Sequence, residues 1–468
     1  MEQRTVDVAI IGAGSAGLYA LGQVRPSGKS FVLINGGHLG TTCARVGCMP
    51  SKALIQVAED FHRRNILSRY GVEGYDELEL DQEETLDHVR DLRDTFVDRV
   101  IANSTDRLPE DAFIEGYARF VDPHTLEVDG RRIRAERIII ATGSRPIVPE
   151  PWQRFGDRIV TTDSVFELEE LPASMAVIGL GVIGLEIGQS LARLGVEVTG
   201  FDQLDTIGAL DDEAVARVAI EAIGRDLPIH LGHAAEITEE EGRLRVTAGD
   251  QSVLVDRVLA SLGRRPNLDS LEIGNSGLEL DERGIPLYDR NTMQCGDSHI
   301  FIAGDVNGER PLLHEAGDEG RIAGRNAVSE RVLAFRRKVP LSINFCDPNI
   351  CHVGMRFQEL DPDTSAIGEV RFAPVGRAMI MGKNRGIIRV YGDRASGRLL
   401  GAEMACVKGE NLAHLLAWCI ERGQTVGELL RMPFYHPVIE EALQAALYDL
   451  YHKVEAKNEG PVTELELL

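Results

Sequence analysis

The residues of this 468-residue chain that are best suited to redox chemistry lie in one short segment near its start. Cys43 and Cys48 stand in the segment Gly40-Thr41-Thr42-Cys43-Ala44-Arg45-Val46-Gly47-Cys48-Met49-Pro50-Ser51-Lys52. Two cysteines at this spacing, within about a turn of a helix, can meet and close a small disulfide ring. A thiolate near a helix N-terminus also has a lowered pKa and is reactive. The segment predicts a thiol–disulfide redox centre, with two buried structural thiols as the alternative.

A candidate acid–base group stands near the other end, in Phe434-Tyr435-His436-Pro437-Val438-Ile439-Glu440-Glu441. A carboxylate five residues after a histidine can hold its ring, fix the tautomer and stabilise the imidazolium, which makes the histidine a general base. Taken alone, a histidine in such a position is more often structural. The pairing of His436 with Glu441 is therefore a hypothesis that needs the rest of the sequence.

Two glycine motifs predict nucleotide sites. The first is Gly12-Ala13-Gly14-Ser15-Ala16-Gly17, which follows an apolar run and opens an apolar helix. Such glycines allow a tight turn and close approach to a pyrophosphate, which the free N–H groups of the helix N-terminus then bind. An acidic residue usually follows the second strand of such a unit and accepts the ribose hydroxyls. Here that position is Asn35, whose amide can still hydrogen-bond a ribose.

The second motif is Gly179-Leu180-Gly181-Val182-Ile183-Gly184, again between a predicted strand and a helix. The next predicted strand ends at Asp202, whose carboxylate would accept a ribose 2′-OH and repel a 2′-phosphate. No arginine stands beside it, since the neighbours are Gln203, Leu204 and Asp205. The second site is therefore predicted to prefer NAD to NADP.

The elements that position these motifs are predicted by short apolar runs that end near glycine. Continuous Val/Ile runs suit strands buried on both faces of a parallel sheet. They occur at 6–11, 31–34, 138–141, 175–178, 196–199, 255–262 and 300–303. Helical patterns lie between several of them, as at Gly184–Arg193, so we expect a doubly wound α/β architecture.

Other patterns predict further elements. The segment Asp81–Ala102 has apolar residues at helical spacing and is predicted to form a long amphipathic helix. Glu236–Val246 is predicted to form a hairpin. Beyond about Pro340, three short apolar segments predict an antiparallel sheet, and helices follow near 411–422 and 438–450. The three segments are Met379–Met381, Gly386–Tyr391 and Leu399–Ala405.

Composition excludes several classes of protein. The net charge is −24, which disfavours binding to nucleic acid or to an anionic membrane surface. No apolar run reaches the length of a membrane span, and the first 17 residues lack the features of a signal peptide. Seven cysteines in 468 residues are not a disulfide scaffold, so we expect a cytoplasmic protein whose paired cysteines are catalytic. No metal site is predicted.

Taken together, the motifs resemble those of the pyridine nucleotide–disulfide oxidoreductase family over nearly the whole chain. They include both glycine motifs, the cysteine segment, Ala141-Thr142-Gly143-Ser144-Arg145-Pro146, Gly263-Arg264-Arg265-Pro266-Asn267, Ala303-Gly304-Asp305 and His436-Pro437 with Glu441. The resemblance is strongest to the branch that oxidises dihydrolipoamide. It implies two Rossmann-like domains, for FAD and NAD(P), and a C-terminal α+β dimerisation domain. These would span 1–148 and 272–340 (FAD), 149–271 (NAD) and 341–468 (dimerisation).

The resemblance also implies roles for individual residues. Cys48 would be the thiol next to the flavin, and Cys43 the thiol that exchanges with substrate. Lys52 and Glu186 would pair near the flavin, Asp305 would contact the ribityl–phosphate region, and His436 would serve the other subunit of a homodimer. The FAD site would comprise Gly12, Gly14, Ser15, Gly17, Asn35, Thr42, Thr142, Gly143, Gly304 and Asp305. The NAD site would comprise Gly179, Gly181, Gly184, Glu186, Asp202 and Gly263.

The implied activity is oxidation of a protein-bound dihydrolipoyl group, with electrons passing through FAD to NAD. Four positions depart from the family pattern, namely Thr41, Phe434, Tyr435 and Val438, and by the resemblance Phe434 and Tyr435 would flank the substrate entrance. The alternatives are therefore reduction of another small disulfide or of a metal ion, or a nicotinamide transhydrogenase. A non-enzymatic flavoprotein that senses NADH or scaffolds a complex would need neither the thiols nor the histidine. A second disulfide between Cys346 and Cys351 is disfavoured by Pro348.

Overall fold

The structure is a computed structural model that describes residues 3–458, 460 and 462–466. Its first sheet has the strand order β3-β2-β1-β6-β5-β4, with β17 added beside β6. Strands β1, β2, β3, β6 and β17 run parallel, whereas β4 and β5 are antiparallel additions. The bounds are Gln3–Ile11 (β1), Phe31–Asn35 (β2), Phe113–Glu115 (β3), Arg119–Asp122 (β4), Thr125–Val128 (β5), Arg131–Ile140 (β6) and Ile300–Ile302 (β17). The predicted apolar runs thus form the buried parallel centre.

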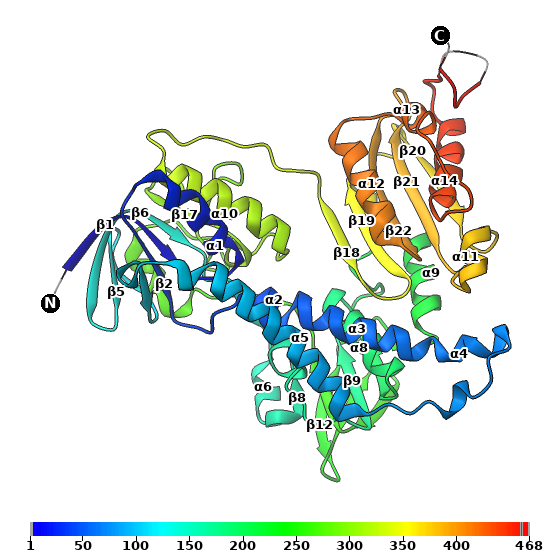
Figure 1. The fold of residues 1–468 in the computed structure, drawn as a ribbon, viewed down its shortest axis with the longest axis horizontal. Coiled ribbons are helices and arrows are strands. Elements are labelled where there is room, and N and C mark those ends of the chain that lie inside the picture. Colours follow the sequence, from blue (N-terminus) through cyan, green and yellow to red (C-terminus); the bar gives the residue numbers. More distant parts are fainter. Residues whose placement is uncertain (1–2, 459, 461, 467–468) are drawn as a thin grey trace.

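Helices α1 (Ser15–Val24) and α10 (Leu313–Val328) lie side by side on one face of this sheet (Figure 1). They pack closely because α10 turns glycines toward α1. A Cβ added at Gly320 would stand only 2.2 Å from the carbonyl oxygen of Ala16. The start of α1, where the first glycine motif lies, is therefore held between the sheet and a helix from almost 300 residues later in the chain.

The second parallel sheet has the order β11-β10-β9-β15-β8. Its strands are Ile159–Val160 (β8), Ser174–Ile178 (β9), Glu197–Phe201 (β10), Ile229–His230 (β11) and Arg257–Ala260 (β15). Helices α8 (Val182–Arg193) and α9 (Glu213–Ile223) connect them, and short helices α6 (Glu150–Gln153) and α7 (Thr162–Val165) precede β9. A separate antiparallel sheet contains β12 (Glu236–Glu240), β13 (Arg243–Ala248) and β14 (Gln251–Val255), so the predicted hairpin is confirmed. A two-stranded link, β7 (Ser144–Pro146) with β16 (Arg264–Pro266), marks where the chain enters and leaves this part.

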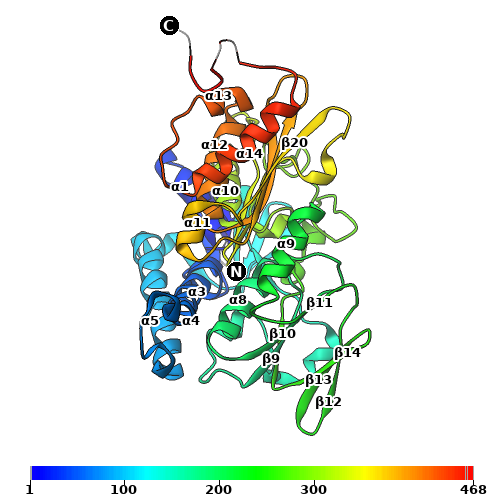
Figure 2. The ribbon, with the colours of Figure 1, turned by 90° about the vertical axis from the view of Figure 1, so that its right-hand side faces the viewer.

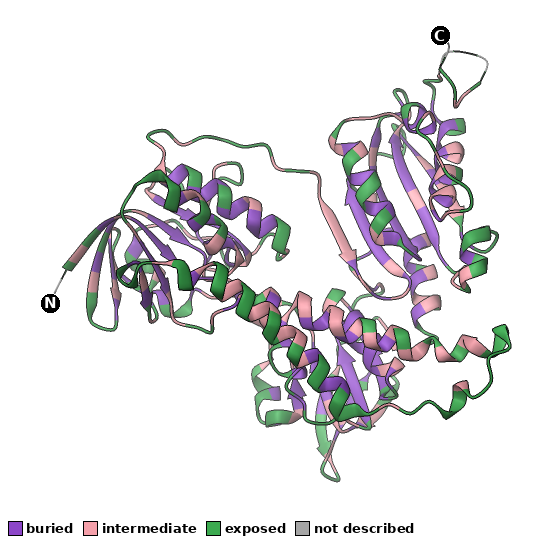
Figure 3. Cartoon of the chain, viewed as in Figure 1, coloured by how far each residue is buried: buried purple, intermediate pink, exposed green. Residues whose placement is uncertain are grey.

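The cysteine segment forms α2 (Thr42–Val46) and the start of α3 (Cys48–His62), followed by α4 (Arg64–Leu67) and α5 (Gln82–Asn103). The predicted long helix is confirmed as α5, and Asp81 caps it by accepting the N–H of Glu84 at 3.1 Å. Most of α5 is exposed (Figure 3), as its charged composition predicts. Helix α3 packs against α8, so the redox segment is braced by the second sheet's first helix.

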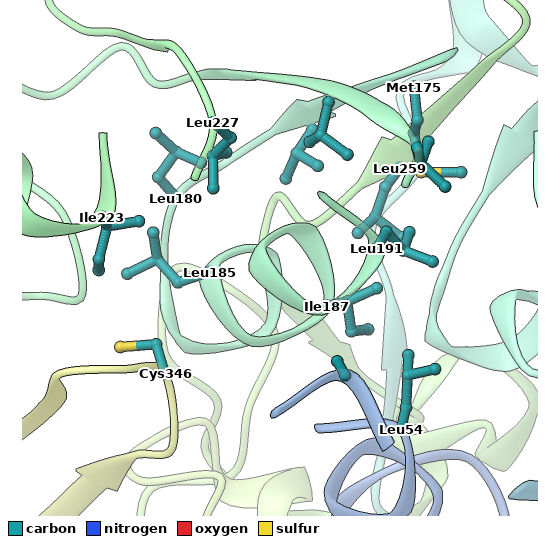
Figure 4. Close-up of a cluster of buried hydrophobic side chains, with 14 of the residues drawn as sticks. Leu54, Met175, Leu180, Leu185, Ile187, Leu191, Ile223, Leu227, Leu259 and Cys346 are labelled. Atoms are coloured by element: carbon teal, nitrogen blue, oxygen red, sulfur yellow. The ribbon is translucent and has the colours of Figure 1, made fainter. Parts of the chain in front are cut away.

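The cluster of buried side chains around α8 shows how this bracing arises (Figure 4). Leu185, Ile187 and Leu191 project from α8 into the core, and Leu54 of α3 lies next to Ile187. Cys346, from the C-terminal part of the chain, reaches the same cluster near Leu185. One apolar core therefore joins the redox helix, the second sheet and the C-terminal part, which makes their relative positions a property of packing.

The C-terminal sheet is antiparallel, with the order β18-β19-β22-β21-β20. Its strands are Leu341–Asn344 (β18), Asn349–Gly354 (β19), Ser365–Arg371 (β20), Ile387–Asp393 (β21) and Leu399–Cys406 (β22). Four helices accompany it, namely α11 (Gly376–Met381), α12 (Gly409–Glu421), α13 (Val426–Leu430) and α14 (Glu440–Lys453). The antiparallel sheet and the two late helices were expected from the sequence, and both are present.

The prediction for Met379–Met381 was wrong. These residues are in helix α11 and not in a strand, and the third predicted strand of the sheet is instead β20. Ala378 is fully buried, whereas Met379 and Ile380 are 56% and 63% exposed. Three successive apolar residues do not distinguish a strand from a short helix, and here Gly382 ends the helix in the left-handed conformation.

Candidate functional site

The two cysteines of the redox segment lie on either side of a break between helices. Cys43 is in α2 and Cys48 is the first residue of α3, with Gly47 between them in a non-helical conformation. Thr41 precedes α2 with φ of 67°, a left-handed value that suits glycine, and its hydroxyl accepts the N–H of Ala44 at 3.2 Å. A threonine is tolerated at this position because its hydrogen bond to the start of α2 offsets part of the backbone strain.

The pKa values of the two thiols are shifted in opposite directions. The pKa of Cys48 is lowered to about 7, because the Cys43 thiol donates a hydrogen bond to it and the Lys52 ammonium is near. The pKa of Cys43 is raised, because its proton is shared with Cys48 and because the group is partly buried. In the reduced state Cys48 is therefore the thiolate and Cys43 keeps the proton.

Lys52 is held by a buried carboxylate. Its Nζ lies 2.7 Å from Oε2 of Glu186 on α8, and the Glu186 side chain is only 4% exposed. Glu186 also accepts the backbone N–H of Phe345 at 2.9 Å, and Lys52 Nζ lies 4.6 Å from the centre of the Phe345 ring. The predicted Lys52–Glu186 contact is present, and residue 345, which the sequence did not single out, completes it.

The packing around the first glycine motif leaves open space at the start of α1. A Cβ at Gly12 would stand 2.2 Å from the oxygen of Ala141, and one at Gly17 would stand 1.9 Å from that of Gly12. A Cβ at Gly14 would meet nothing within 4 Å, and no side chain caps α1 there. Two glycines are thus required by packing and the third leaves an open cradle at a helix N-terminus, which fits the phosphates of FAD.

The second motif repeats this geometry residue for residue. A Cβ at Gly179 would stand 2.4 Å from the oxygen of Ser261, and one at Gly184 would stand 2.0 Å from that of Gly179. Gly181 again faces open space, and α8 begins without a side-chain cap. A second dinucleotide therefore fits at the start of α8.

Asn35 at the end of β2 and Asp202 after β10 have equivalent positions and make equivalent hydrogen bonds. The amide oxygen of Asn35 accepts the N–H of Ala13 at 3.0 Å, and the carboxylate of Asp202 accepts the N–H of Leu180 at 2.6 Å. Asp202 also accepts the N–H of Leu204 at 2.9 Å. Both side chains therefore hold the glycine turns, and Asn35 does with an amide what Asp202 does with a carboxylate.

Ser15 and Thr42 begin α1 and α2, whereas four other predicted FAD residues, Thr142, Gly143, Gly304 and Asp305, lie around the link between the two sheets. The Thr142 hydroxyl donates to the carbonyl of Asn267 at 2.7 Å, and the Asn267 side-chain amide donates to the Thr142 carbonyl at 3.0 Å. The Ser144 hydroxyl donates to Asp305 at 2.8 Å. Gly143 and Gly304 have φ of 70° and 83°. Segments that lie far apart in the sequence thus meet at one place.

Glu319 is a residue of this region that sequence reasoning missed. It is 1% exposed, and one carboxylate oxygen accepts both the Gly304 N–H at 2.7 Å and the Asn307 amide at 2.8 Å. Arg337 lies 3.0 Å from its other oxygen. A glutamate inside the apolar face of α10 was the available signal, because such a residue is buried only when it is paired.

The predicted acid–base pair is formed in the loop between α13 and α14. His436 Nδ1 lies 2.8 Å from Oε1 of Glu441, and the other carboxylate oxygen accepts the N–H of Val438 at 3.0 Å. These contacts lower the pKa of Glu441, so it stays ionised and holds the imidazole by one nitrogen. The His436 side chain is 80% exposed, which leaves its other nitrogen accessible.

The histidine and the cysteines are not brought together within one chain. The cysteines are on α2 and α3, whereas the loop between α13 and α14 lies in the C-terminal part of the chain, away from both of these helices in the two views (Figures 1 and 2). A cavity of about 540 Å³ adjoins His436, and none of its described lining residues comes from α2 or α3. An active site that uses both groups therefore needs a second copy of the chain.

The other cysteines are unpaired in the structure. Cys295, Cys346, Cys351 and Cys406 are buried and Cys419 is half-buried. The Cys346 thiol donates to the Pro348 carbonyl at 3.1 Å. Among the described residues, no group of three or more His, Cys, Asp or Glu side chains is arranged to hold a metal ion. None of the described helices is long and apolar enough to cross a bilayer.

Comparison with known proteins shows similarity over most of the chain. Residues 6–320 match the family model for pyridine nucleotide-disulphide oxidoreductases, and residues 341–447 match the model for the dimerisation domain of that family. A dihydrolipoyl dehydrogenase of Haloferax volcanii is 31% identical, with 94% of this chain and 95% of the relative covered. A soluble pyridine nucleotide transhydrogenase of Mycobacterium tuberculosis is 28% identical, with 97% and 99% covered. The HOCl-induced flavoprotein disulfide reductase RclA of Escherichia coli, in its Cu(II) complex, has a similar fold (TM-score 0.83, 24% identity, 97% and 100% covered).

Proposed function

The chain belongs to the pyridine nucleotide-disulphide oxidoreductase family, an enzyme family that uses FAD and a pyridine nucleotide, and from this we propose that it oxidises a protein-bound dihydrolipoyl group and reduces NAD. Residues 1–148 with 272–340 would hold FAD, 149–271 would hold NAD, and 341–468 would form the interface of a homodimer. We place this activity in the cytoplasm, where the unpaired state of the remaining cysteines would persist.

The main support for the proposal is that the chain has both a thiol pair with one lowered pKa and a histidine that is hydrogen-bonded to a carboxylate. Cys48 has a pKa of about 7, and His436 is held by Glu441 at 2.8 Å. Transfer of hydride between nucleotides, or sensing of NADH, needs neither group. Exchange with a dithiol needs both, because a thiol must lose its proton before it can attack a disulfide and a good leaving thiolate must depart.

The chain's own groups account for the thiol steps. In the dimer, His436 takes the proton of one substrate thiol, and the resulting thiolate attacks Cys43 Sγ of the Cys43–Cys48 disulfide. The S–S bond breaks and Cys48 leaves as a thiolate, which the nearby Lys52 stabilises. The second substrate thiol then attacks the mixed disulfide, which releases the cyclic disulfide product and leaves Cys43 protonated. The first glycine motif would hold FAD, which would supply the two-electron chemistry that links the enzyme dithiol to NAD.

The preference for NAD rests on Asp202. Its two carboxylate oxygens each accept one backbone N–H, and each oxygen retains a lone pair for a ribose hydroxyl. A 2′-phosphate at that place would face the carboxylate without an arginine to balance it. NADP should therefore be a poor acceptor.

A substrate panel tests the proposal. Purified protein loaded with FAD should form NADH from dihydrolipoamide, and Cys48→Ser should abolish that turnover. Parallel assays should use NADH with glutathione disulfide, with Hg(II) and with thionicotinamide NAD. Loss of the dihydrolipoamide reaction with retention of any one of these would replace the proposed substrate by a different disulfide, a metal ion or a second nucleotide. A thionicotinamide reaction that survives Cys48→Ser would indicate a transhydrogenase.

A further inference from the structure

Residues close to the C-terminus line part of the cavity beside His436. We define the tail as residues 455–466, of which 459 and 461 are outside the described part. The cavity is lined by Leu430, Arg431, Met432, Pro433, Phe434, Tyr435, His436, Glu441, Gln444, Glu464 and Leu465. The last two come from the tail, 25 residues or more after the α13–α14 loop that supplies most of the others. The tail therefore lines the same cavity as His436.

Specific contacts hold the tail in this place. The N–H of Glu455 donates to the carbonyl of Arg394 at 2.8 Å. The side-chain amide of Asn458 donates to the carbonyl of Gly427 on α13 at 2.9 Å and to that of Thr463 at 2.7 Å. Asn458 thus joins the returning tail to the helix that leads directly into the cavity loop.

The packing at this joint is close. A Cβ added at Gly427 would stand 2.1 Å from Oδ1 of Asn458, so glycine is needed there for the amide to approach α13. The N–H of Asn458 also donates to the Tyr451 hydroxyl at 2.7 Å. The tail position is consequently determined by the same helices, α13 and α14, that position His436.

The lining combines apolar surface with the charged side chains of Glu441, Glu464 and Arg431. The side chains of Met432, Phe434, Tyr435 and Leu465 offer hydrocarbon and aromatic surface, and Leu465 is 64% exposed. Glu441 is engaged by His436, and Glu464 brings a second carboxylate into the same cavity. The apolar surface suits a hydrocarbon arm, and the carboxylate of Glu464 disfavours a ligand that brings its own carboxylate close to it.

We propose that the tail is a specificity element of the dithiol site, in which Leu465 contacts the hydrocarbon of the substrate and Glu464 repels a substrate carboxylate. The enzyme would thereby prefer a neutral, amide-linked dihydrolipoyl arm to the free acid or to an anionic peptide disulfide. This inference rests on the proposed function for its substrate class and adds the residues that choose within the class.

The decisive experiment compares two substrates that differ by one charge. We measure kcat/KM with neutral dihydrolipoamide and with anionic dihydrolipoate, and take the ratio of the two for each variant. Glu464→Gln should lower this amide-to-acid ratio about three-fold and Glu464→Lys about ten-fold, as expected for one charge removed or reversed at a solvated site. The matched control is Glu455→Gln, which removes a tail carboxylate that does not line the cavity. Unchanged ratios in both Glu464 variants would overturn the proposal.

A second variant tests whether the tail acts through its position. Asn458→Ala should lower the amide-to-acid ratio as much as a chain that ends at residue 461, because both remove Glu464 from the cavity. Leu465→Ser should lower kcat/KM for the two substrates equally and leave the ratio unchanged. If Asn458→Ala lowers both values equally with no change in ratio, the asparagine has only a structural role and the positional argument is wrong.

A separate measurement keeps this test independent of the proposed function. If the wild-type protein oxidises neither lipoyl substrate, the proposed function fails. The tail can still be tested with phosphine-reduced protein, whose dithiol is oxidised to the disulfide as a chromogenic disulfide reagent is reduced to two thiols. Glu464→Lys should raise the rate with dianionic dithiobis(nitrobenzoate) relative to neutral dithiodipyridine about ten-fold, after subtraction of a Cys43→Ser background. Equal relative rates in wild type and variant would refute the tail's role.

Discussion

Replacing the two partners of the Lys52–Glu186 pair should move the Cys48 pKa in opposite directions. Lys52 lowers this pKa through its positive charge, whereas the Glu186 carboxylate raises it. Lys52→Met removes the favourable charge and leaves Glu186 with the net negative effect. Glu186→Gln removes the unfavourable charge and keeps Lys52. We therefore expect the Cys48 thiolate to form at higher pH in the first variant and at lower pH in the second.

The size of the effect follows from the spacing along α3. Cys48 and Lys52 are four residues apart on one helix, so their Cβ atoms are about 6 Å apart. A unit charge at about 6 Å contributes about 1.4 kcal/mol at an effective dielectric constant of about 40 and about 2.8 kcal/mol at about 20. This corresponds to one to two pH units, so Lys52→Met should raise the Cys48 pKa from about 7 to about 8–9.

The assay is the pH dependence of alkylation of Cys48 in reduced protein. A Cys43→Ser background keeps a hydroxyl donor and leaves one thiol in the redox segment, and peptide mapping by mass spectrometry separates Cys48 from the other cysteines. Lys338→Met is the matched control, because Lys338 is exposed and pairs with Asp318. Shifts of the same sign in Lys52→Met and Glu186→Gln, or a shift in the control as large as theirs, would refute the electrostatic argument.

Three further predictions concern stability and cofactor retention. Burial raises the pKa of Glu403 from 4.5 to about 7, so its contribution to stability is complete below pH 4.5 and is lost as the pH rises through about 7. Glu403→Gln should therefore be more stable than wild type by about 1–3 kcal/mol near pH 8 but not near pH 5, as measured by urea unfolding. Thr41→Ala should lose about 1 kcal/mol of stability with the cap, whereas Thr41→Gly should be nearly neutral because relief of the left-handed backbone offsets the loss. Gly14→Ala should keep the melting temperature of the FAD-free protein but reduce FAD content after purification, whereas Gly17→Ala should lower the melting temperature, because only the second Cβ has no room. Equal effects of the two glycine changes on melting temperature would contradict the cradle assignment.

Much of the architecture was predictable because it depends on local patterns. The Val/Ile runs before each glycine motif became parallel strands, since a chain buried on both faces must be apolar throughout. The long helix after Asp81 followed from its spacing and cap. The one wrong element, Met379–Met381, was a run of three apolar residues, which is too short for a period to be read.

The chemistry of the redox segment and of the His436–Glu441 pair was likewise predictable, because each depends on residues a few positions apart. Contacts between distant segments were not. The sequence around Phe345, Glu319 and Glu464 does not indicate that Phe345 contacts Lys52, that Glu319 binds Gly304 or that Glu464 lines the cavity of His436. Each contact exists because separate elements pack around a shared core, and a sequence pattern contains no information on which surfaces meet.

The sequence by itself determined which reactive groups the protein carries, because residue type and short spacing suffice to make a nucleotide turn, a dithiol or a buttressed imidazole. Only the tertiary structure decided which of these groups lie close together in space. It placed Cys43 and Cys48 far from His436 of the same chain, and it brought the tail to the wall of the histidine cavity. The physical reason is that packing of α3 on α8, and of the tail on α13, involves residues more than 30 positions apart, whose meeting depends on the whole fold.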